Sequence, residues 1–367
     1  MHSAETIQLP ESGRQTPIRV GIVGTGFAAH LHADAIERCR DARLEMVCGI
    51  EKLDEFCRKW PVEKKTDDFN KLCRHPEVDV VSVCTPTFIH RPVVEAAAAA
   101  GKQIICEKPL ATTLEDARAM VRSAAEAGVF LCYAEDWCFS PILKRVEEIV
   151  AEGALGEILY VKAKEVHSGS HSEYAKKIKY CGGGALFHIG CHPINWVRHL
   201  VGGEVVQVVG LTTGGGGENM VHKDYEGEDW GVALMSFEGG QQGFVEANYI
   251  TLGGMDDTVE IYGTKGALKV ELSLGSPIHV YSREGYKYSV EKADNQLGWT
   301  RPAVDELWQL GYPPEIEYFI GCVRDGREPM MGARGEDGLA SMEVAFAAYE
   351  SSRSGKAVKM ADFRAHR

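Results

Sequence analysis

Apolar residues in the first third of the chain form short uninterrupted runs, and most of these runs are followed by a helical stretch. The runs 18–23, 44–51, 78–84, 104–106 and 129–133 are rich in Val, Ile and Cys, which is typical of strands buried on both faces. The segments 30–38, 92–100 and 114–127 have helical composition, and Gly101 and Gly128 are expected to end the last two. This alternation of strand and helix predicts a doubly wound parallel sheet.

The pattern changes after residue 138. A helix is predicted at 141–152, and β-like runs separated by glycine turns follow at 158–166, 205–212, 232–237, 243–250, 258–262, 267–272 and 278–281. Segments 214–217 and 293–314 are expected to be loops, and helices return at 314–325 and 335–354. We predict an α/β chain with a tail at 1–17, a Rossmann domain at 18–138, and a second α/β domain at 139–367. The second domain should hold a large open, mostly antiparallel sheet, and a C-terminal helix could pack back on the first domain.

Composition narrows the classes of partner. The 367 residues carry a formal charge of −13, which argues against binding to nucleic acid or to an anionic membrane surface. The sequence has no run of eighteen apolar residues, so we expect no membrane span. The eleven cysteines form no C-x-x-C pair and several lie in apolar runs, which favours reduced, buried thiols. Together with the polar stretch 1–17, this predicts a cytoplasmic protein.

A glycine-rich turn follows the first predicted strand. Its sequence is Gly24-Thr25-Gly26-Phe27-Ala28-Ala29, a G-x-G-x-x-A pattern that leads directly into a predicted helix. In such a turn the first glycine permits the tight bend, the second lets a pyrophosphate approach the backbone, and the alanine permits close helix–sheet packing. We therefore expect this strand–turn–helix to bind a dinucleotide through residues 24–28.

An acidic residue at the end of the second strand commonly binds the ribose hydroxyls of the cofactor. Glu51 is the candidate here, although it stands slightly beyond the usual spacing, and a solvated helix start at Glu51 and Lys52 is an equal alternative. Because no arginine follows the strand to bind a 2′-phosphate, the sequence favours NAD and leaves NADP as an alternative.

Charged residues stand at the exit of another predicted strand, in Ile104-Ile105-Cys106-Glu107-Lys108-Pro109. Ligands of open parallel sheets bind at the carboxyl ends of the strands, so Glu107 and Lys108 are candidates for the site. The alternative is a surface Glu–Lys pair at the end of a strand.

The motifs together resemble the glucose–fructose oxidoreductase / inositol 2-dehydrogenase / MocA (Gfo/Idh/MocA) family over nearly the whole chain. The resemblance rests on the Gly24 fingerprint, Cys84-Thr85-Pro86-x-x-x-His90, Glu107-Lys108-Pro109, Gly182-Gly183-Gly184-x-Leu186, and His192. It implies that Thr85, Pro86, Thr87, His90, Glu107 and Lys108 contact the cofactor, and that the Lys-Pro peptide is often cis. It also implies that the second domain binds the substrate and that its sheet forms a homodimer or homotetramer interface.

The resemblance further implies hydride transfer between a sugar, inositol or polyol carbinol carbon and the nicotinamide. His192 can remove the hydroxyl proton, and Lys108 can hydrogen-bond the same oxygen. A core histidine is the alternative for His192. Relatives commonly have aspartate where this chain has His188. Our hypothesis is that His188 and His192, both neutral, share the proton chemistry with a partly deprotonated Lys108, because burial would lower the lysine pKa.

Further polar and aromatic residues are candidates for substrate binding: Glu135, Trp137, His167, His171 and His188, with Trp299 as a second ring that could floor a sugar. An acidic turn and simple aromatic packing are the alternatives. His188 and His192 are four residues apart, as on one helical face, and with Glu165 and His167 they could bind a divalent metal. A polar substrate pocket without metal is the more ordinary interpretation.

Three functions remain open from the sequence. The first is an NAD(P)-dependent dehydrogenase of a sugar, inositol or related polyol. The second is a redox-neutral lyase or glycosidase that uses tightly bound NAD for transient oxidation, and the third is a non-catalytic NAD(P) sensor. The retention of Lys108 and His192 argues against the sensor. The sequence does not name the substrate, since specificity lies in loops of the second domain.

Overall fold

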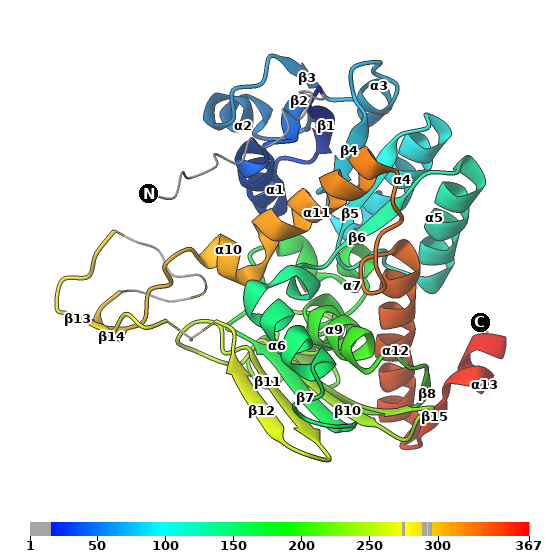
Figure 1. Ribbon diagram of the computed structural model, residues 1–367, viewed down its shortest axis with the longest axis vertical. Coiled ribbons are helices and arrows are strands. Elements are labelled where there is room, and N and C mark those ends of the chain that lie inside the picture. Colours follow the sequence, from blue (N-terminus) through cyan, green and yellow to red (C-terminus); the bar gives the residue numbers. More distant parts are fainter. Residues whose placement is uncertain (1–15, 274–275, 288–291, 293–295, 367) are drawn as a thin grey trace, which may run out of the picture.

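A six-stranded parallel sheet forms the N-terminal part of the computed structural model, which describes residues 16–273, 276–287, 292 and 296–366 (Figure 1). The strand order is β3-β2-β1-β4-β5-β6, as expected for a doubly wound sheet, so this prediction is confirmed. The strands are β1 (Ile18–Val23), β2 (Ala42–Cys48), β3 (Lys64–Thr66), β4 (Val80–Val83), β5 (Gln103–Glu107) and β6 (Leu131–Ala134). Nearly all of the predicted tail lies outside the described residues.

Helices connect these strands: α1 (Phe27–Arg38), α2 (Leu53–Lys59), α3 (Phe69–Cys73), α4 (His90–Ala99) and α5 (Leu114–Ala127). Thr113 caps α5 by accepting a hydrogen bond from the backbone N–H of Asp116, and Gly128 ends it in the left-handed region, as the sequence predicts. The helices α2 and α3 and the strand β3 are too short to show a clear periodicity, so the sequence pattern did not reveal them.

A seven-stranded mixed sheet forms the second part, in the order β12-β11-β7-β10-β9-β8-β15. Only the pair β7–β10 is parallel, so the expected open, mostly antiparallel sheet is confirmed. Its strands are β7 (Ile158–Val166), β8 (Val205–Thr212), β9 (Trp230–Phe237), β10 (Gln242–Asn248), β11 (Thr258–Gly263), β12 (Ala267–Glu271) and β15 (Val358–Lys359).

One face of this sheet is covered by helices that include α6 (Pro141–Ala151), α8 (Ala185–His188), α9 (Cys191–Val201) and α12 (Gly335–Ser354) (Figure 1). The strands also carry exposed apolar side chains: Leu159, Val206, Val209, Leu211 and Leu234. The alternation of buried and exposed residues along β8 is typical of a sheet covered on one face only.

The C-terminal helices join the two sheets. Helix α11 (Tyr312–Asp325) packs on α1, and α12 packs on α5 as well as on β8. Arg118 of α5 forms an ion pair with Glu343 of α12, and the N–H of Tyr133 in β6 donates to the carbonyl of Ala333. The chain end thus fixes the parallel sheet against the mixed one. None of the described helices is long and apolar enough to cross a membrane.

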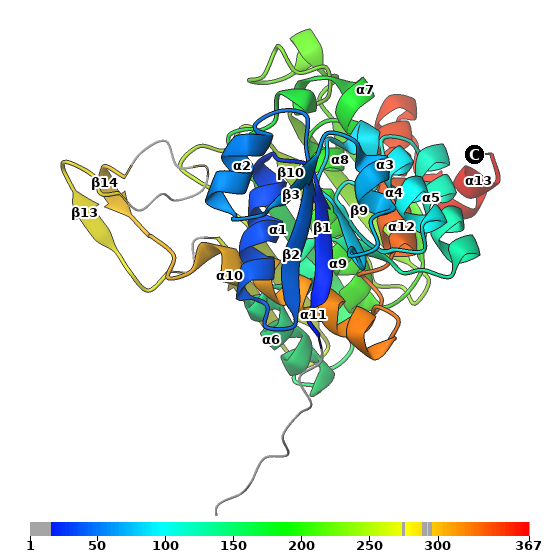
Figure 2. The ribbon, with the colours of Figure 1, turned by 90° about the horizontal axis from the view of Figure 1, so that it is seen from above.

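Two segments differ from the expected loops. Residues 214–217 run into a short 3₁₀ turn, η4 (Gly216–Glu218), and the stretch 293–314 includes β14 (Gly298–Thr300), α10 (Glu306–Leu310) and the start of α11. Strand β14 pairs with β13 (Val280–Ser282) in a hairpin that projects from the body (Figure 2). Residues 293–295 of that stretch lie outside the described residues. The elements η4, β14 and α10 are each too short for their periodicity to exceed the turn signals around them.

Helix α12 approaches β8 so closely that a side chain does not fit between them. A Cβ atom built on Gly210 would lie 2.4 Å from the carbonyl oxygen of Ala348. Backbone cannot yield as a flexible side chain can, so the glycine is required for this contact.

We predict that Gly210→Ala lowers the free energy of unfolding by about 1–3 kcal/mol, the usual cost of overpacking a core. Gly217→Ala is the matched control, because a Cβ there meets no atom within 4 Å. Urea unfolding followed by circular dichroism measures both variants, and equal midpoints would contradict the proposed role of this contact.

Candidate active site

A cavity of about 890 Å³ opens between the two sheets. Residues that follow β1, β4 and β5 line one side of it, and residues from β7 and the α8–α9 region line the other. Most of the residues singled out in the sequence lie on its wall: Gly24, Thr25, Gly26, Phe27, Ala28, Glu51, Thr85, Pro86, Thr87, Glu107, Lys108, Trp137, Glu165, His167, His171, His188 and His192. The fold therefore brings together groups that are far apart in the sequence.

The turn after β1 fits a dinucleotide. Gly24 has φ +123°, and a Cβ there would lie 2.3 Å from the carbonyl oxygen of Cys84, so only glycine fits. A Cβ on Gly26 would meet no protein atom within 4 Å, and the N-terminus of α1 has no side-chain cap, so N–H groups remain for an anion. The hydroxyl of Thr85 is buried without a partner beside the same cavity. These features fit a pyrophosphate and its flanking ribose.

Glu51 lies on the cavity wall with an exposed side chain, and its backbone carbonyl accepts a hydrogen bond of 2.6 Å from the Thr25 hydroxyl. A Cβ on Gly49 would lie 2.5 Å from the Thr25 methyl group. The close approach of Thr25 therefore explains why the spot where an acidic residue was expected carries glycine, with Glu51 two residues further on.

Glu107 fixes the turn that carries Lys108. One carboxylate oxygen accepts the N–H of Lys108 at 3.0 Å, and the other lies 3.0 Å from Nε2 of the fully buried His32. Burial lowers the pKa of His32, but Cys84 and Glu107 more than offset it, and the net pKa is well above the usual range. His32 and Glu107 therefore form a buried ion pair, and the cis peptide implied for Lys108-Pro109 is confirmed.

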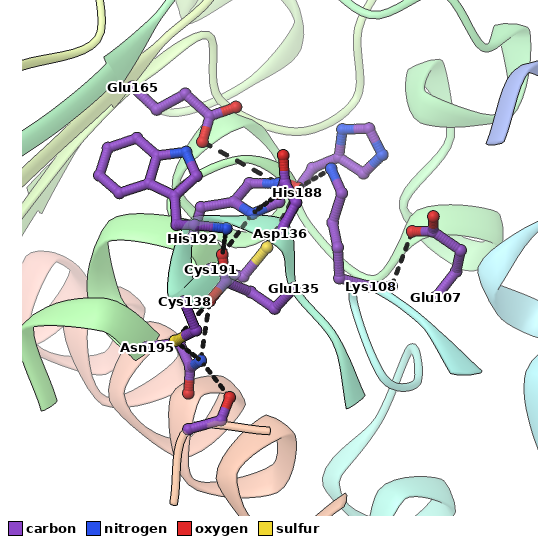
Figure 3. Close-up of polar contacts among 12 residues, drawn as sticks. Glu107, Lys108, Glu135, Asp136, Cys138, Glu165, His188, Cys191, His192 and Asn195 are labelled. Atoms are coloured by element: carbon purple, nitrogen blue, oxygen red, sulfur yellow. Dashed lines mark hydrogen bonds and ion pairs between the residues drawn. The ribbon is translucent and has the colours of Figure 1, made fainter. Parts of the chain in front are cut away.

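His192 is the second residue of α9 (Cys191–Val201) and is held by carboxylates (Figure 3). Its Nδ1 lies 2.7 Å from Oε1 of Glu135 and 2.9 Å from Oδ1 of Asp136. The amide of Asn195 donates to the other oxygen of Glu135 at 2.8 Å, and the ring of Trp137 stacks on the imidazole at 6.4 Å between centroids. This arrangement fixes the ring and leaves Nε2 4.0 Å from Oε2 of Glu165.

These carboxylates keep His192 cationic, so the hypothesis that it rests in the neutral form is wrong. Burial lowers its pKa, but the charges of Glu165 and Asp136 raise it, and the net pKa is well above the usual range. Nδ1 has one hydrogen, which goes to Glu135, so Oδ1 of Asp136 has no hydrogen bond although it is close. Burial raises the pKa of Glu165 to about 7, although His192 and Lys108 oppose that shift.

The hypothesis of a partly deprotonated Lys108 is wrong in direction. Burial does lower the pKa of Lys108, but the nearby acidic groups Cys191, Glu165 and Glu107 outweigh it, and the net pKa is raised. The sequence shows only that histidine replaces aspartate at position 188, whereas the approach of Glu165 and Asp136 to the amine depends on the tertiary structure.

His188 and His192 do not share a helical face. His188 is the last residue of α8, the helix is interrupted at Ile189 and Gly190, and His192 lies in the first turn of α9. A Cβ on Gly190 would lie 2.3 Å from the carbonyl oxygen of Leu186, which explains the glycine at this break. Nδ1 of His188 lies 2.6 Å from the Tyr249 hydroxyl, and the Lys108 ammonium donates to the backbone carbonyl of His188 at 3.4 Å.

The four residues considered for a metal do not come together as one set of ligands. Nδ1 of His167 accepts the N–H of Gly169, and Nδ1 of His188 is bonded to Tyr249. Among the described residues, the group with ligand atoms within 4.8 Å of one another is Glu135, Asp136 and His192, which shares only His192 with the predicted set. The closeness of these three side chains is explained by the contacts that Glu135 and Asp136 make with Nδ1 of His192.

Three sequence candidates take other places. Glu135 does not line the cavity but lies behind His192, which it positions. His90 is also behind the wall, where its ring nitrogens bond the carbonyls of Thr85 and Leu110 at 2.9 and 3.1 Å. Trp299 is 74% exposed on β14 and does not line the cavity, so its ring is not placed to stack against a ligand there.

The sequence patterns did not identify several residues of this site, among them His32, Asn195 and Tyr249. Asn195 had a weak signal, because it stands three residues after His192 on the same helix. Nothing local distinguishes His32 or Tyr249 from an ordinary polar or aromatic residue, because the side chains that they contact come from distant parts of the chain.

Comparison with known proteins agrees with this geometry. Residues 18–135 match the model of an oxidoreductase family with an NAD-binding Rossmann fold, and residues 147–360 match the model of that family's C-terminal α/β domain. The chain belongs to the Gfo/Idh/MocA oxidoreductase family. The resemblance expected from the motifs is thus confirmed, as is the NAD-binding character of the first domain.

Two relatives of low sequence identity match nearly the whole length of this chain. The chain is 26% identical to myo-inositol 2-dehydrogenase of Thermotoga maritima over 94% of this chain and 98% of the relative. It is 27% identical to D-apiose dehydrogenase of Paraburkholderia graminis over 94% and 90%. Among solved structures, GenD2 from gentamicin A biosynthesis in complex with NAD matches with a TM-score of 0.87 and 26% identity, over 96% of this chain and 99% of that one.

Replacing each of the two glycines of the dinucleotide fingerprint by alanine should have a different effect on stability, although both replacements should weaken NAD binding. We expect Gly24→Ala to lower the thermal midpoint and to weaken NAD binding, because its Cβ meets backbone at a positive φ. Gly26→Ala should leave the midpoint of the cofactor-free protein unchanged and still weaken NAD binding, since its Cβ enters only the space for the pyrophosphate. Calorimetric titration with NAD and differential scanning calorimetry measure the two effects, and a destabilised Gly26→Ala protein would contradict this assignment.

Proposed function

We propose that this family member is an NAD-dependent dehydrogenase that acts on a CH–OH group of a sugar, inositol or related polyol. The observation that carries the proposal is the meeting of Lys108, from the end of a Rossmann strand, and His192, from the second domain, at one cavity that also contains the dinucleotide fingerprint. Relatives named as dehydrogenases of myo-inositol, scyllo-inositol and D-apiose support the substrate class. One relative is named for NAD and another for NADP, and we propose NAD because no arginine follows β2.

In this proposal the residues prepare the hydroxyl for oxidation. Bound NAD supplies the hydride acceptor. The Lys108 ammonium hydrogen-bonds the substrate oxygen and stabilises negative charge that develops on it. His192 in its neutral form removes the hydroxyl proton through Nε2, and Glu135 at Nδ1 stabilises the imidazolium that results. In carbonyl reduction the same groups act in reverse, with imidazolium as the acid.

We also propose that two or more copies assemble through the mixed sheet. The exposed apolar residues Val206, Val209 and Leu211 follow one another on β8 at alternate or near-alternate positions, which is typical of a sheet face that is covered by a partner. Light scattering coupled to size-exclusion chromatography should give a mass above 40.3 kDa. A mass equal to one chain would contradict this part of the proposal.

The activity is tested with a panel of inositols, aldoses and keto sugars, read as the absorbance of NADH. We expect Lys108→Met and His192→Gln to lower kcat by about 10²- to 10⁴-fold, the usual contribution of positioned acid–base groups. Lys269→Met, on the exposed edge strand β12, is the control and should retain full activity. Unchanged turnover in the Lys108 and His192 variants would exclude the mechanism, and product without net NADH would indicate the redox-neutral chemistry.

The pH dependence follows from the charges around His192. Because its pKa is raised, kcat/KM for oxidation should increase with pH only above the ordinary histidine range, as the imidazolium loses its proton. Removing one carboxylate in Asp136→Asn lowers that pKa, so the acid limb should move to lower pH. Profiles of kcat/KM against pH for the two proteins measure the shift. An acid limb that moves upward or stays in place would contradict the electrostatic account.

A further inference from the structure

Tyr249 is a buried tyrosine of the second domain whose hydroxyl contacts His188 at the cavity. It follows β10, is 1% exposed, and its Oη lies 2.6 Å from Nδ1 of His188. Among the described contacts this is the one hydrogen bond of the Tyr249 hydroxyl. Its backbone is also held, because its N–H donates to the carbonyl of Asp229 and its carbonyl accepts from Nε2 of His222. The phenol is therefore a fixed group rather than a mobile one.

The direction of this hydrogen bond follows from which polar group would otherwise be buried without a hydrogen-bond partner. A neutral imidazole has one nitrogen with a proton and one without. If Nδ1–H donated to the phenol oxygen, the phenol proton would be left without an acceptor in a buried place. Leaving a buried donor unpaired is costly, whereas a phenol O–H that donates to Nδ1 satisfies both groups. The proton of the imidazole must then be on Nε2.

The charges around His188 favour the same neutral form. Burial and the positive charges of Lys108, His192 and Lys292 lower the pKa of His188 well below the usual range. Burial raises the pKa of Tyr249 well above its usual value, so the phenol keeps its proton. His188 lines the cavity, and no described contact occupies its Nε2. The N–H at Nε2 is therefore available to a ligand.

We propose that Tyr249 is a positioning residue that holds His188 in the neutral tautomer with its proton on Nε2, so that His188 donates a hydrogen bond to the substrate. The group that it receives is an oxygen with no proton of its own, in a carboxylate or carbonyl of a sugar derivative. The Nε2–H donor of His188 lies near three positive charges, those of Lys108, His192 and Lys292, so it favours an oxygen that carries negative charge. A hydroxyl is a poorer partner, because it would accept this hydrogen bond and still need an acceptor for its own proton. The substrate class rests on the proposed function, whereas the tautomer does not.

The tautomer is tested without turnover, by ¹⁵N NMR of the histidine-labelled full chain. The imidazole signals of His188 are identified by their loss in His188→Gln. We expect one unprotonated nitrogen, Nδ1, and one protonated nitrogen, Nε2, across neutral pH, and in Tyr249→Phe we expect a mixture of tautomers. Tyr225→Phe is the control, since this neighbouring ring packs 5.8 Å from Tyr249 and has no described contact with His188. A proton on Nδ1, or an imidazolium, in the unaltered protein would overturn the proposal.

The substrate class is tested by the binding of D-glucose and D-glucuronate to the protein saturated with NAD, because the two differ by a carboxylate in place of CH₂OH. We expect glucuronate to bind about tenfold more tightly, the difference between a charge-assisted and an ordinary hydrogen bond. His188→Asp, which can only accept, should remove that preference, and Tyr249→Phe should reduce it while NAD affinity stays unchanged. Equal binding, or binding of neither sugar, would overturn the substrate class. Failure of the polyol panel alone would instead count against the proposed function.

Discussion

The structure depends on keeping several charges in one place that is largely closed to water. Lys108 and His192 both face the cavity as cations, and two buried cations would repel each other and lose hydration. Glu135, Asp136 and Glu165 offset that cost, because they converge on His192 from the end of β6 and from β7. Glu165 and Asp136 raise the pKa of both the Lys108 amine and the His192 imidazole, which sets how each can take part in proton transfer.

A buried ion pair between His32 and Glu107 supports the cluster of charges around Lys108 and His192. His32 and Glu107 lie beneath the turn that carries Lys108, and Glu107 bonds the backbone N–H of that lysine. Ser82 at the end of β4 binds the other ring nitrogen of His32 at 2.8 Å. Helix α1, strand β4 and the Lys108 turn are thus connected through buried polar groups. Such a network holds the strand ends in one arrangement, because each unmatched partner would be costly.

The mixed sheet contributes chemistry as well as a surface. Glu165 and His167 lie at the end of β7, and Tyr249 follows β10, the parallel neighbour of β7. Since these two strands run in the same direction, their carboxyl ends meet at one edge, and that edge faces the Rossmann domain. The C-terminal helices α11 and α12 hold the two sheets in this relation by packing on α1 and α5. The site exists only because this packing brings the two strand edges together.

The sequence by itself determined the elements with a long or strong periodicity. The strands β7 and β8 and the helices α5 and α12 have the bounds that their patterns predict, and the fingerprint of Gly24 and Gly26 predicted the NAD-binding Rossmann domain that the family model confirms. Local motifs were enough there, since each glycine or capping residue acts on its own neighbours. Only the tertiary structure decided which groups meet. It moved Glu135 and His90 behind the wall, separated His188 from His192, reversed the direction of the lysine pKa shift, and joined Tyr249 to His188. Electrostatic effects depend on distance in space, and residues such as Glu165 and Tyr249 reach the site from strands whose pairing no local pattern encodes.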